Sequence, residues 1–132
     1  MRSYTDEKFG FVFFYPNNWI LEKENNIISV YNAENGLGAL QFSIFYVGND
    51  NQIDLKVELE NFLGDYESVE VEMVNNLAYS TFDNNDRTWK YWLFQNGSSL
   101  ILTSYNCEIE DKGKEDGVIN QILNSFIQSS IS

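Results

Sequence analysis

Short runs of aromatic and β-branched residues, each followed by a turn signal, occupy most of this chain of 132 residues. Asparagine supplies most of the turn signals, with 17 copies against a single proline. Its side chain bonds nearby backbone and it tolerates a left-handed conformation, so it favours turns. The asparagine–glycine pair at 96–97 is the strongest short hairpin signal. This punctuation predicts short antiparallel strands joined by hairpins. Paired asparagines stand at 17–18, 25–26, 75–76 and 84–85.

The segments between these turns have the composition and alternation of strands. In one of them Val69, Val71 and Met73 alternate with Glu70 and Glu72, which predicts a strand with one buried and one solvated face. The predicted strands are residues 9–15, 19–24, 27–32, 39–47, 69–73, 77–82, 87–95 and 99–106.

Two segments have helical patterns. Between residues 118 and 127 the apolar residues form one stripe at helical spacing, and Glu115 and Asp116 precede it, where the helix dipole favours negative charge. Residues 53–63 also carry a helical apolar face, followed by Gly64 as a C-terminal cap. That segment alternates like a strand as well. We favour the helix because its leucine, glutamate and lysine residues are good helix formers.

The order of these elements predicts the fold class. About four strands, a helix, about four more strands and a final helix are typical of an α+β domain. The mass of 15.3 kDa and the 43% of hydrophobic residues suffice for one core. We therefore expect a single α+β domain over residues 1–132, with an antiparallel sheet of about six to eight strands and two main helices packed on it.

Two stretches resemble the Mog/PsbP-like superfamily. Residues 9–19, FGFVFFYPNNW, are similar to a family signature in which a strand ends in an aromatic-Tyr-Pro-x-x-Trp turn. Residues 122–126, ILNSF, are similar to the family's closing helix. The resemblance implies a sheet with helices packed on it. It does not imply one function, since members include photosystem II extrinsic proteins, a Ran-binding import factor and bacterial domains of unknown function, which this chain resembles most. No functional residue of the family can be matched to this sequence.

The composition excludes several kinds of chemistry. Without histidine there is no Ser-His-Asp or Cys-His site and no imidazole metal ligand, and one cysteine permits no internal disulfide or structural zinc site. Cys107 is followed by Glu108, which favours an inert thiol with a raised pKa. The 20 acidic and 8 basic residues give a net charge of −12, which argues against nucleic acid or an anionic membrane as a partner.

Carboxylates are the remaining candidates for chemistry. Glu108, Glu110 and Asp111 lie together, and the loops at 83–86 and 48–51 offer oxygen ligands for calcium. Neither loop has the EF-hand spacing, and a solvated acidic surface explains the carboxylate pairs more simply. We therefore expect no catalytic residue, no metal site and no cofactor.

The strong acidity of the chain favours the interpretation that it is a non-enzymatic protein-binding module whose partner is a basic protein. The candidate contacts are Glu70, Glu72, Asp83 and Asp86, with Trp92 as an apolar anchor if its face of the sheet is open. One alternative is an immunity protein that neutralises a basic toxin. Another is a small-ligand carrier or a carboxylate-based enzyme. No apolar stretch of signal-peptide length opens the chain, which favours a cytoplasmic location.

Overall fold

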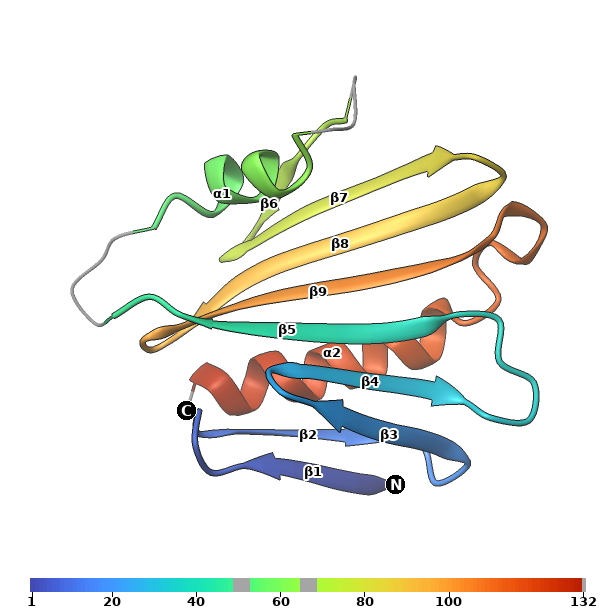
Figure 1. Ribbon diagram of the computed structural model, residues 1–132, viewed down its shortest axis with the longest axis horizontal. Helices are drawn as coiled ribbons and strands as arrows, with labels where there is room; N and C mark the ends of the chain where they lie inside the picture. Colours follow the sequence, from blue (N-terminus) through green and yellow to red (C-terminus); the bar gives the residue numbers. More distant parts are fainter. Residues whose placement is uncertain (49–52, 65–68, 132) are drawn as a thin grey trace.

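The computed structural model describes residues 1–48, 53–64 and 69–131 (Figure 1). These residues form strands, two α-helices and one short 3-10 helix. In chain order the elements are β1 (Arg2–Asp6), β2 (Phe11–Tyr15), β3 (Trp19–Glu24), β4 (Ile27–Asn32), β5 (Ala39–Tyr46), α1 (Leu55–Phe62), β6 (Glu72–Val74), β7 (Leu77–Asn84), β8 (Arg87–Asn96), β9 (Ser99–Glu108), η1 (Ile109–Asp111) and α2 (Asp116–Ile131).

Seven of the strands form one antiparallel sheet in the order β3-β4-β5-β9-β8-β7-β6. The α+β class, the large antiparallel sheet and the two helices confirm the prediction. Two features differ from it. The segment 2–6, for which we predicted no strand, is β1, and it pairs with β2 in a separate two-stranded ribbon. This ribbon lies beside α2 rather than extending the main sheet (Figure 1).

The asparagine pairs at 17–18, 25–26 and 75–76 make turns as predicted, whereas at the fourth pair Asn84 ends β7 and the turn residues are 85 and 86. Asn25 and Asn75 both have φ of +56°, and Asn85 and Asp86 have φ of +55° and +64°, values that an asparagine or aspartate side chain tolerates. At the predicted 96–97 turn the register is shifted by one residue. Asn96 pairs with Ser99 as the last residue of β8, so the turn residues are 97 and 98.

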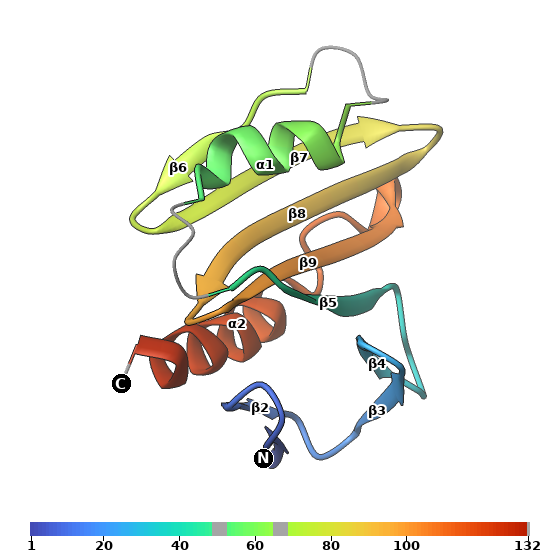
Figure 2. The ribbon, with the colours of Figure 1, turned by 60° about the vertical axis from the view of Figure 1, so that its left-hand side comes forward.

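The two faces of the sheet have different covers (Figure 2). One face packs against α2 and the ribbon, around the fully buried rings of Phe13, Phe42 and Phe126. The centroid of the Phe126 ring lies 5.6 Å from that of Phe13 and 5.1 Å from that of Phe42. The opposite face packs against α1, where Leu59 and Leu63 contact the β7–β9 part of the sheet. We call these the α2 face and the α1 face.

The stretch at 9–19 behaves as its resemblance implies. Pro16 follows the last residue of β2, and Trp19 begins β3 with only 3% of its surface exposed. The Trp19 N–H donates to the Pro16 carbonyl across 3.1 Å, which closes the turn between them. The Phe14 N–H donates to Ser125 Oγ at 2.9 Å and ties the ribbon to α2.

Asp6 anchors the other end of the ribbon. Asp6 is only 3% exposed. Its carboxylate accepts hydrogen bonds from the Phe9 N–H and from the Tyr4 hydroxyl, each at 3.0 Å. Lys23 Nζ lies 3.4 Å from the same carboxylate and links the ribbon to β3. Burial alone would raise the pKa of Asp6, but these contacts outweigh burial and lower it.

The helix predicted at 53–63 is α1, so the strand alternative for that segment is wrong. Asp54 caps the helix, since its Oδ1 accepts from the Val57 N–H at 3.2 Å. The helix predicted at 118–127 is α2, which begins two residues earlier than predicted. Within the described part of the chain, neither helix has the length and apolar character needed to cross a membrane.

Candidate functional site

The five residues predicted to contact a partner lie in three separate places. Glu70 and Glu72 lie at the outer edge of the sheet, around β6. Asp83 and Asp86 lie at the other end of β7, at its turn into β8. Trp92 lies in the middle of β8. Glu72 lies opposite Tyr79, four residues before Asp83 on β7, so about 13 Å of strand separates the two acidic pairs.

Trp92 as an exposed anchor is wrong, because only 6% of its surface is exposed. Its side chain and that of Phe94 belong to the core on the α2 face, and its ring centroid lies 5.7 Å from that of Tyr79. Trp92 and Phe94 lie two residues apart and therefore share one face of β8. The face that carries Trp92 is covered, so this residue stabilises the sheet.

The first acidic pair belongs to a short exposed segment that we call the β6 edge, consisting of Glu70, Glu72, Met73 and Val74. All four are exposed, and Met73 and Val74 are 45% and 48% exposed. Glu72, Met73 and Val74 form β6, the last strand of the sheet, and Glu70 lies two residues before it.

The β6 edge differs from the strand predicted at 69–73, which is wrong in extent and in the burial of Met73. The regular pairing with β7 begins only at Glu72. Before it, the Glu70 carbonyl accepts from Ser80 Oγ at 2.8 Å. Val71 is 8% exposed and packs in the core under α1, whereas Met73 lies beyond that cover. The alternation in the sequence could not show where the cover ends.

Helix α1 adds to the acidic surroundings of this edge, since it lies over β7 next to β6 (Figure 2). Asp54, Glu58 and Glu60 are acidic, and Lys56 is the only basic residue in the described segment 53–64. Val57 is exposed at 46%, which extends the mixture of carboxylates and apolar side chains onto the helix.

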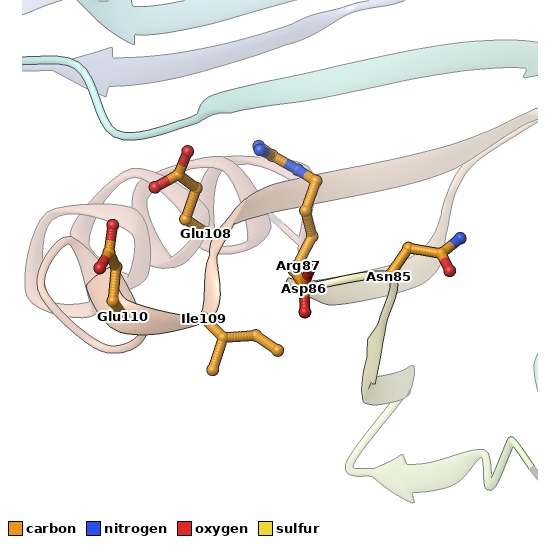
Figure 3. A pocket seen from close by; sticks show the side chains of 6 residues that line it. All are labelled: Asn85, Asp86, Arg87, Glu108, Ile109 and Glu110. Carbon is orange, nitrogen blue, oxygen red and sulfur yellow. The ribbon is translucent and has the colours of Figure 1, made fainter.

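Asp86, of the second acidic pair, lines a polar pocket at the β7–β8 turn, with a volume of about 440 Å³. Figure 3 shows its six side chains gathered where the turn meets the end of β9. The Ile109 N–H donates to the Asp86 carbonyl at 3.1 Å, and Arg87 Nε donates to Asn106 Oδ1 at 2.8 Å. The lining residues are Asn85, Asp86, Arg87, Glu108, Ile109 and Glu110.

The carboxylates that the sequence places together at 108–111 are brought together in space. Oxygens of Glu108, Glu110 and Asp111 all lie within 4.8 Å of one another. A hydrogen bond with Glu108 and the negative charges of Glu108 and Asp111 raise the pKa of Glu110. Such a cluster attracts cations and holds a proton more readily than a single carboxylate does. The loop at 83–86 supplies Asp86 to the adjoining pocket, whereas residues 49–51 of the other predicted calcium loop lie outside the described residues.

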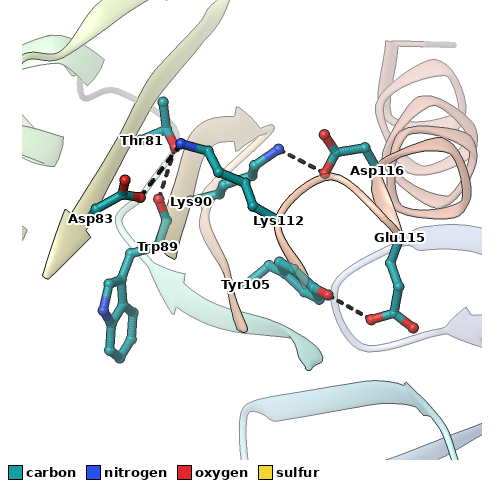
Figure 4. Close-up of polar contacts among 8 residues, drawn as sticks. All are labelled: Thr81, Asp83, Trp89, Lys90, Tyr105, Lys112, Glu115 and Asp116. Carbon is teal, nitrogen blue, oxygen red and sulfur yellow. Dashed lines mark hydrogen bonds and ion pairs between the residues drawn. The ribbon is translucent and has the colours of Figure 1, made fainter. Parts of the chain in front are cut away.

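Asp83 forms an ion pair, because Lys112 Nζ lies 3.5 Å from its carboxylate (Figure 4). Lys90 on β8 reaches Asp116 at the start of α2 at 2.8 Å. Nearby, the buried Tyr105 hydroxyl donates to Glu115 Oε1 at 2.5 Å. These pairs fix the segment between β9 and α2.

Two buried groups nearby have perturbed acidity. Burial first, and then the Glu115 carboxylate, raise the pKa of Tyr105. Burial is also the main cause that raises the pKa of Cys107, whose surface is 1% exposed. Among the neighbouring carboxylates, that of Asp111 raises the pKa of Cys107 more than that of Glu115 does. The sequence had suggested Glu108 for this role. A buried thiol with a raised pKa is a poor nucleophile, as expected for Cys107.

The main sheet, the ribbon and the two helices together define a Mog/PsbP-like fold, as the sequence resemblance implies. The solution structure of cyanobacterial PsbP (CyanoP) from Synechocystis matches with a TM-score of 0.65 and 17% identity, over 95% of this chain and 90% of that one. A crystal structure from Bacteroides thetaiotaomicron matches with a TM-score of 0.63 and 14% identity. This second match covers 94% of this chain and 47% of that one. No family model and no curated protein matches the sequence.

Proposed function

We propose that this chain is a non-enzymatic protein-binding module that engages a basic partner through the β6 edge. One observation carries the proposal: Glu70 and Glu72 share one exposed segment with Met73 and Val74. Interfaces typically combine an apolar centre with a polar rim, and the apolar contacts at the centre supply most of the binding energy. At the β6 edge both kinds of side chain are present within five residues.

The charge of the whole chain supports the same partner chemistry. A net charge of −12 accelerates encounters with a basic protein and disfavours acidic ones, because the complementary potentials act before contact is made. Both effects weaken as salt is added. Of the other predicted contacts, Asp83 already has Lys112 as an ion-pair partner, so its carboxylate is less available than those of Glu70 and Glu72.

The test compares two double variants with the same net charge. Glu70→Lys with Glu72→Lys changes the β6 edge, and Glu24→Lys with Glu34→Lys changes exposed acids at the other side of the sheet. Each Glu→Lys adds two charges, so both doubles go from −12 to −8. Immobilised proteins are exposed to a lysate of the native cells at low salt and eluted with stepwise salt.

The proposal predicts that a basic protein is retained by the wild type and by the Glu24/Glu34 double, and is lost from the Glu70/Glu72 double. Equal retention by all three proteins contradicts the assignment of the β6 edge. If the retained protein is a toxin whose gene neighbours this one, the narrower role of a cytoplasmic immunity protein follows.

A second candidate function is the binding of a small cationic ligand at the pocket of the β7–β8 turn. The proximity of Glu108, Glu110 and Asp111 favours it, because their clustered carboxylates repel one another, and Lys114, whose Nζ lies 2.8 Å from Asp111, offsets only part of their charge. Calcium is the simplest probe. A rise in the thermal unfolding temperature with millimolar calcium, absent from Glu110→Gln, supports this role, and no shift contradicts it.

A further inference from the structure

We infer that the β6 edge accepts an extended basic segment of the partner as an additional strand of the sheet. This inference rests on the proposed function and specifies how the partner binds. Strand addition combines main-chain hydrogen bonds with side-chain contacts on alternating residues.

The register of β6 leaves a backbone donor and acceptor available. Among the described residues β6 pairs with β7 alone, and Val74 pairs with Leu77 across the two-residue turn. In such a hairpin the pair next to the turn is hydrogen-bonded, and hydrogen-bonded pairs alternate with non-hydrogen-bonded pairs. Met73 and Ala78 form the next pair, so the N–H and C=O of Met73 point away from β7.

The opposite edge of the sheet is protected in a way that the β6 edge is not. Strand β3 carries the consecutive charges of Glu22, Lys23 and Glu24, and Lys23 is held by Asp6 of the ribbon. Charged residues on an edge strand oppose pairing with another chain. The β6 edge carries charges of one sign beside the exposed Met73 and Val74, so it repels an acidic strand and attracts a basic one.

The side chains of β6 define the chemistry of the added strand. Glu72 and Val74 point to one face and Met73 to the other, because side chains alternate along a strand. A lysine or arginine opposite Glu72 and an apolar residue beside Met73 complement both faces. The occupant is therefore a basic segment in which charged and apolar residues alternate.

A second copy of this chain is a poor occupant for the same reason. Pairing of β6 with β6 brings the Glu70 and Glu72 carboxylates of both copies close together, and like charges across a strand pair are destabilising. Each copy also carries a net charge of −12, which opposes association.

The test uses two synthetic peptides of equal length and charge, with blocked ends. One alternates lysine and valine and can form a strand. The other alternates lysine and proline, which removes half of the backbone donors and favours a polyproline conformation. Binding is measured by fluorescence anisotropy at low salt, with the wild type, the Glu70→Lys/Glu72→Lys double, Met73→Pro and Met73→Ala. Both Met73 variants lose the side chain, but only Met73→Pro also loses the outward N–H.

Strand addition predicts that the lysine–valine peptide binds the wild type and Met73→Ala about tenfold more tightly than the lysine–proline peptide, because the N–H and C=O of Met73 then gain backbone partners. Met73→Pro is expected to remove this preference. Equal binding of both peptides to the wild type overturns strand addition and leaves the acidic binding role intact, provided that the Glu70/Glu72 double weakens both. If that double binds both peptides as the wild type does, the proposed function fails as well.

Amide exchange provides a readout that does not depend on the folding of Met73→Pro. Saturation of the wild type with the lysine–valine peptide is expected to slow exchange of the Met73 N–H, because this N–H then donates a hydrogen bond to the backbone of the added strand. Unchanged exchange of that amide overturns the inference.

Discussion

Phe126 is predicted to be the side chain on which the packing of α2 most depends. It is fully buried, and its ring centroid lies 4.5 Å from that of Phe11 in the ribbon and 5.1 Å from that of Phe94 in the main sheet. With the contacts to Phe13 and Phe42, the ring joins α2, the ribbon and two strands of the sheet. Phe126→Ala therefore removes contacts to three parts of the fold at once.

The magnitude follows from burial and ring contacts. Replacing a buried phenylalanine by alanine costs about 3–5 kcal/mol, because transfer free energy is lost and a cavity remains. Each aromatic pair contributes about 0.5–1.5 kcal/mol beyond burial, although four pairs sharing one ring do not add fully. We expect Phe126→Ala to lower the free energy of unfolding by about 4–5 kcal/mol. Phe126→Leu keeps most of the volume and is expected to cost about 1–2 kcal/mol.

Urea unfolding followed by tryptophan fluorescence measures these differences by linear extrapolation. The matched control is Phe14→Ala in β2, since Phe14 is 44% exposed and only its backbone bonds to α2. The control is expected to cost about 1 kcal/mol or less. A loss for Phe126→Ala that is no larger than the loss for Phe14→Ala would refute the proposed packing.

Three further predictions concern stability. Tyr105→Phe removes the hydroxyl that bonds a buried carboxylate and is expected to cost about 1–3 kcal/mol at neutral pH. Because the pKa of Tyr105 is raised on folding, the wild type loses stability as pH rises above about 10, and the variant lacks this loss in alkaline unfolding experiments. Asp6→Ala is expected to cost about 1–3 kcal/mol at pH 7. The pKa of Asp6 is lowered, so the cost measured by acid titration of stability shrinks as pH falls below about 4; a cost independent of pH contradicts the assignment. In Gly38→Ala the new Cβ collides with the carbonyl of Asn106, so thermal unfolding is expected to show a loss of about 1–3 kcal/mol. Its control, Gly117→Ala in α2, meets no atom within 4 Å and is expected to stabilise by up to about 1 kcal/mol.

The main sheet could be predicted because its signals are local. Asn25, Asn75 and Asn85 adopt the left-handed backbone that makes asparagine a turn residue. Asp54 caps α1, and the spacing of leucines along this helix follows the face that it buries. Each of these signals depends on a few neighbouring residues, so it can be recognised in the sequence before the tertiary structure is known.

Strand β1 could not be predicted in the same way. Arg2 to Asp6 shows no apolar alternation, and its burial runs from exposed at Arg2 to buried at Asp6. The strand forms because every residue pairs with β2, and because Asp6 bonds Tyr4, Phe9 and Lys23. These contacts join positions up to 17 residues apart and leave no periodic signal in the segment itself.

The candidate site was predicted in part for a related reason. Charge alone was enough to predict Glu70 and Glu72 as surface residues, because a carboxylate side chain is ordinarily exposed. The exposure of Met73 depends on how far α1 covers its face of the sheet, and the burial of Trp92 depends on the elements that cover the α2 face. Periodicity shows that two residues share a face of a strand, but not whether another element covers that face.

The most direct test of the central claim is to map where the lysine–valine peptide binds by ¹⁵N NMR titration of the wild type. Chemical shift changes concentrated at residues 70–74 and on α1 are the predicted result, since the exposed carboxylates and apolar side chains coincide there. Changes concentrated at residues 83–87 and 108–111, around the pocket of the β7–β8 turn, would contradict the account and assign binding to that pocket instead.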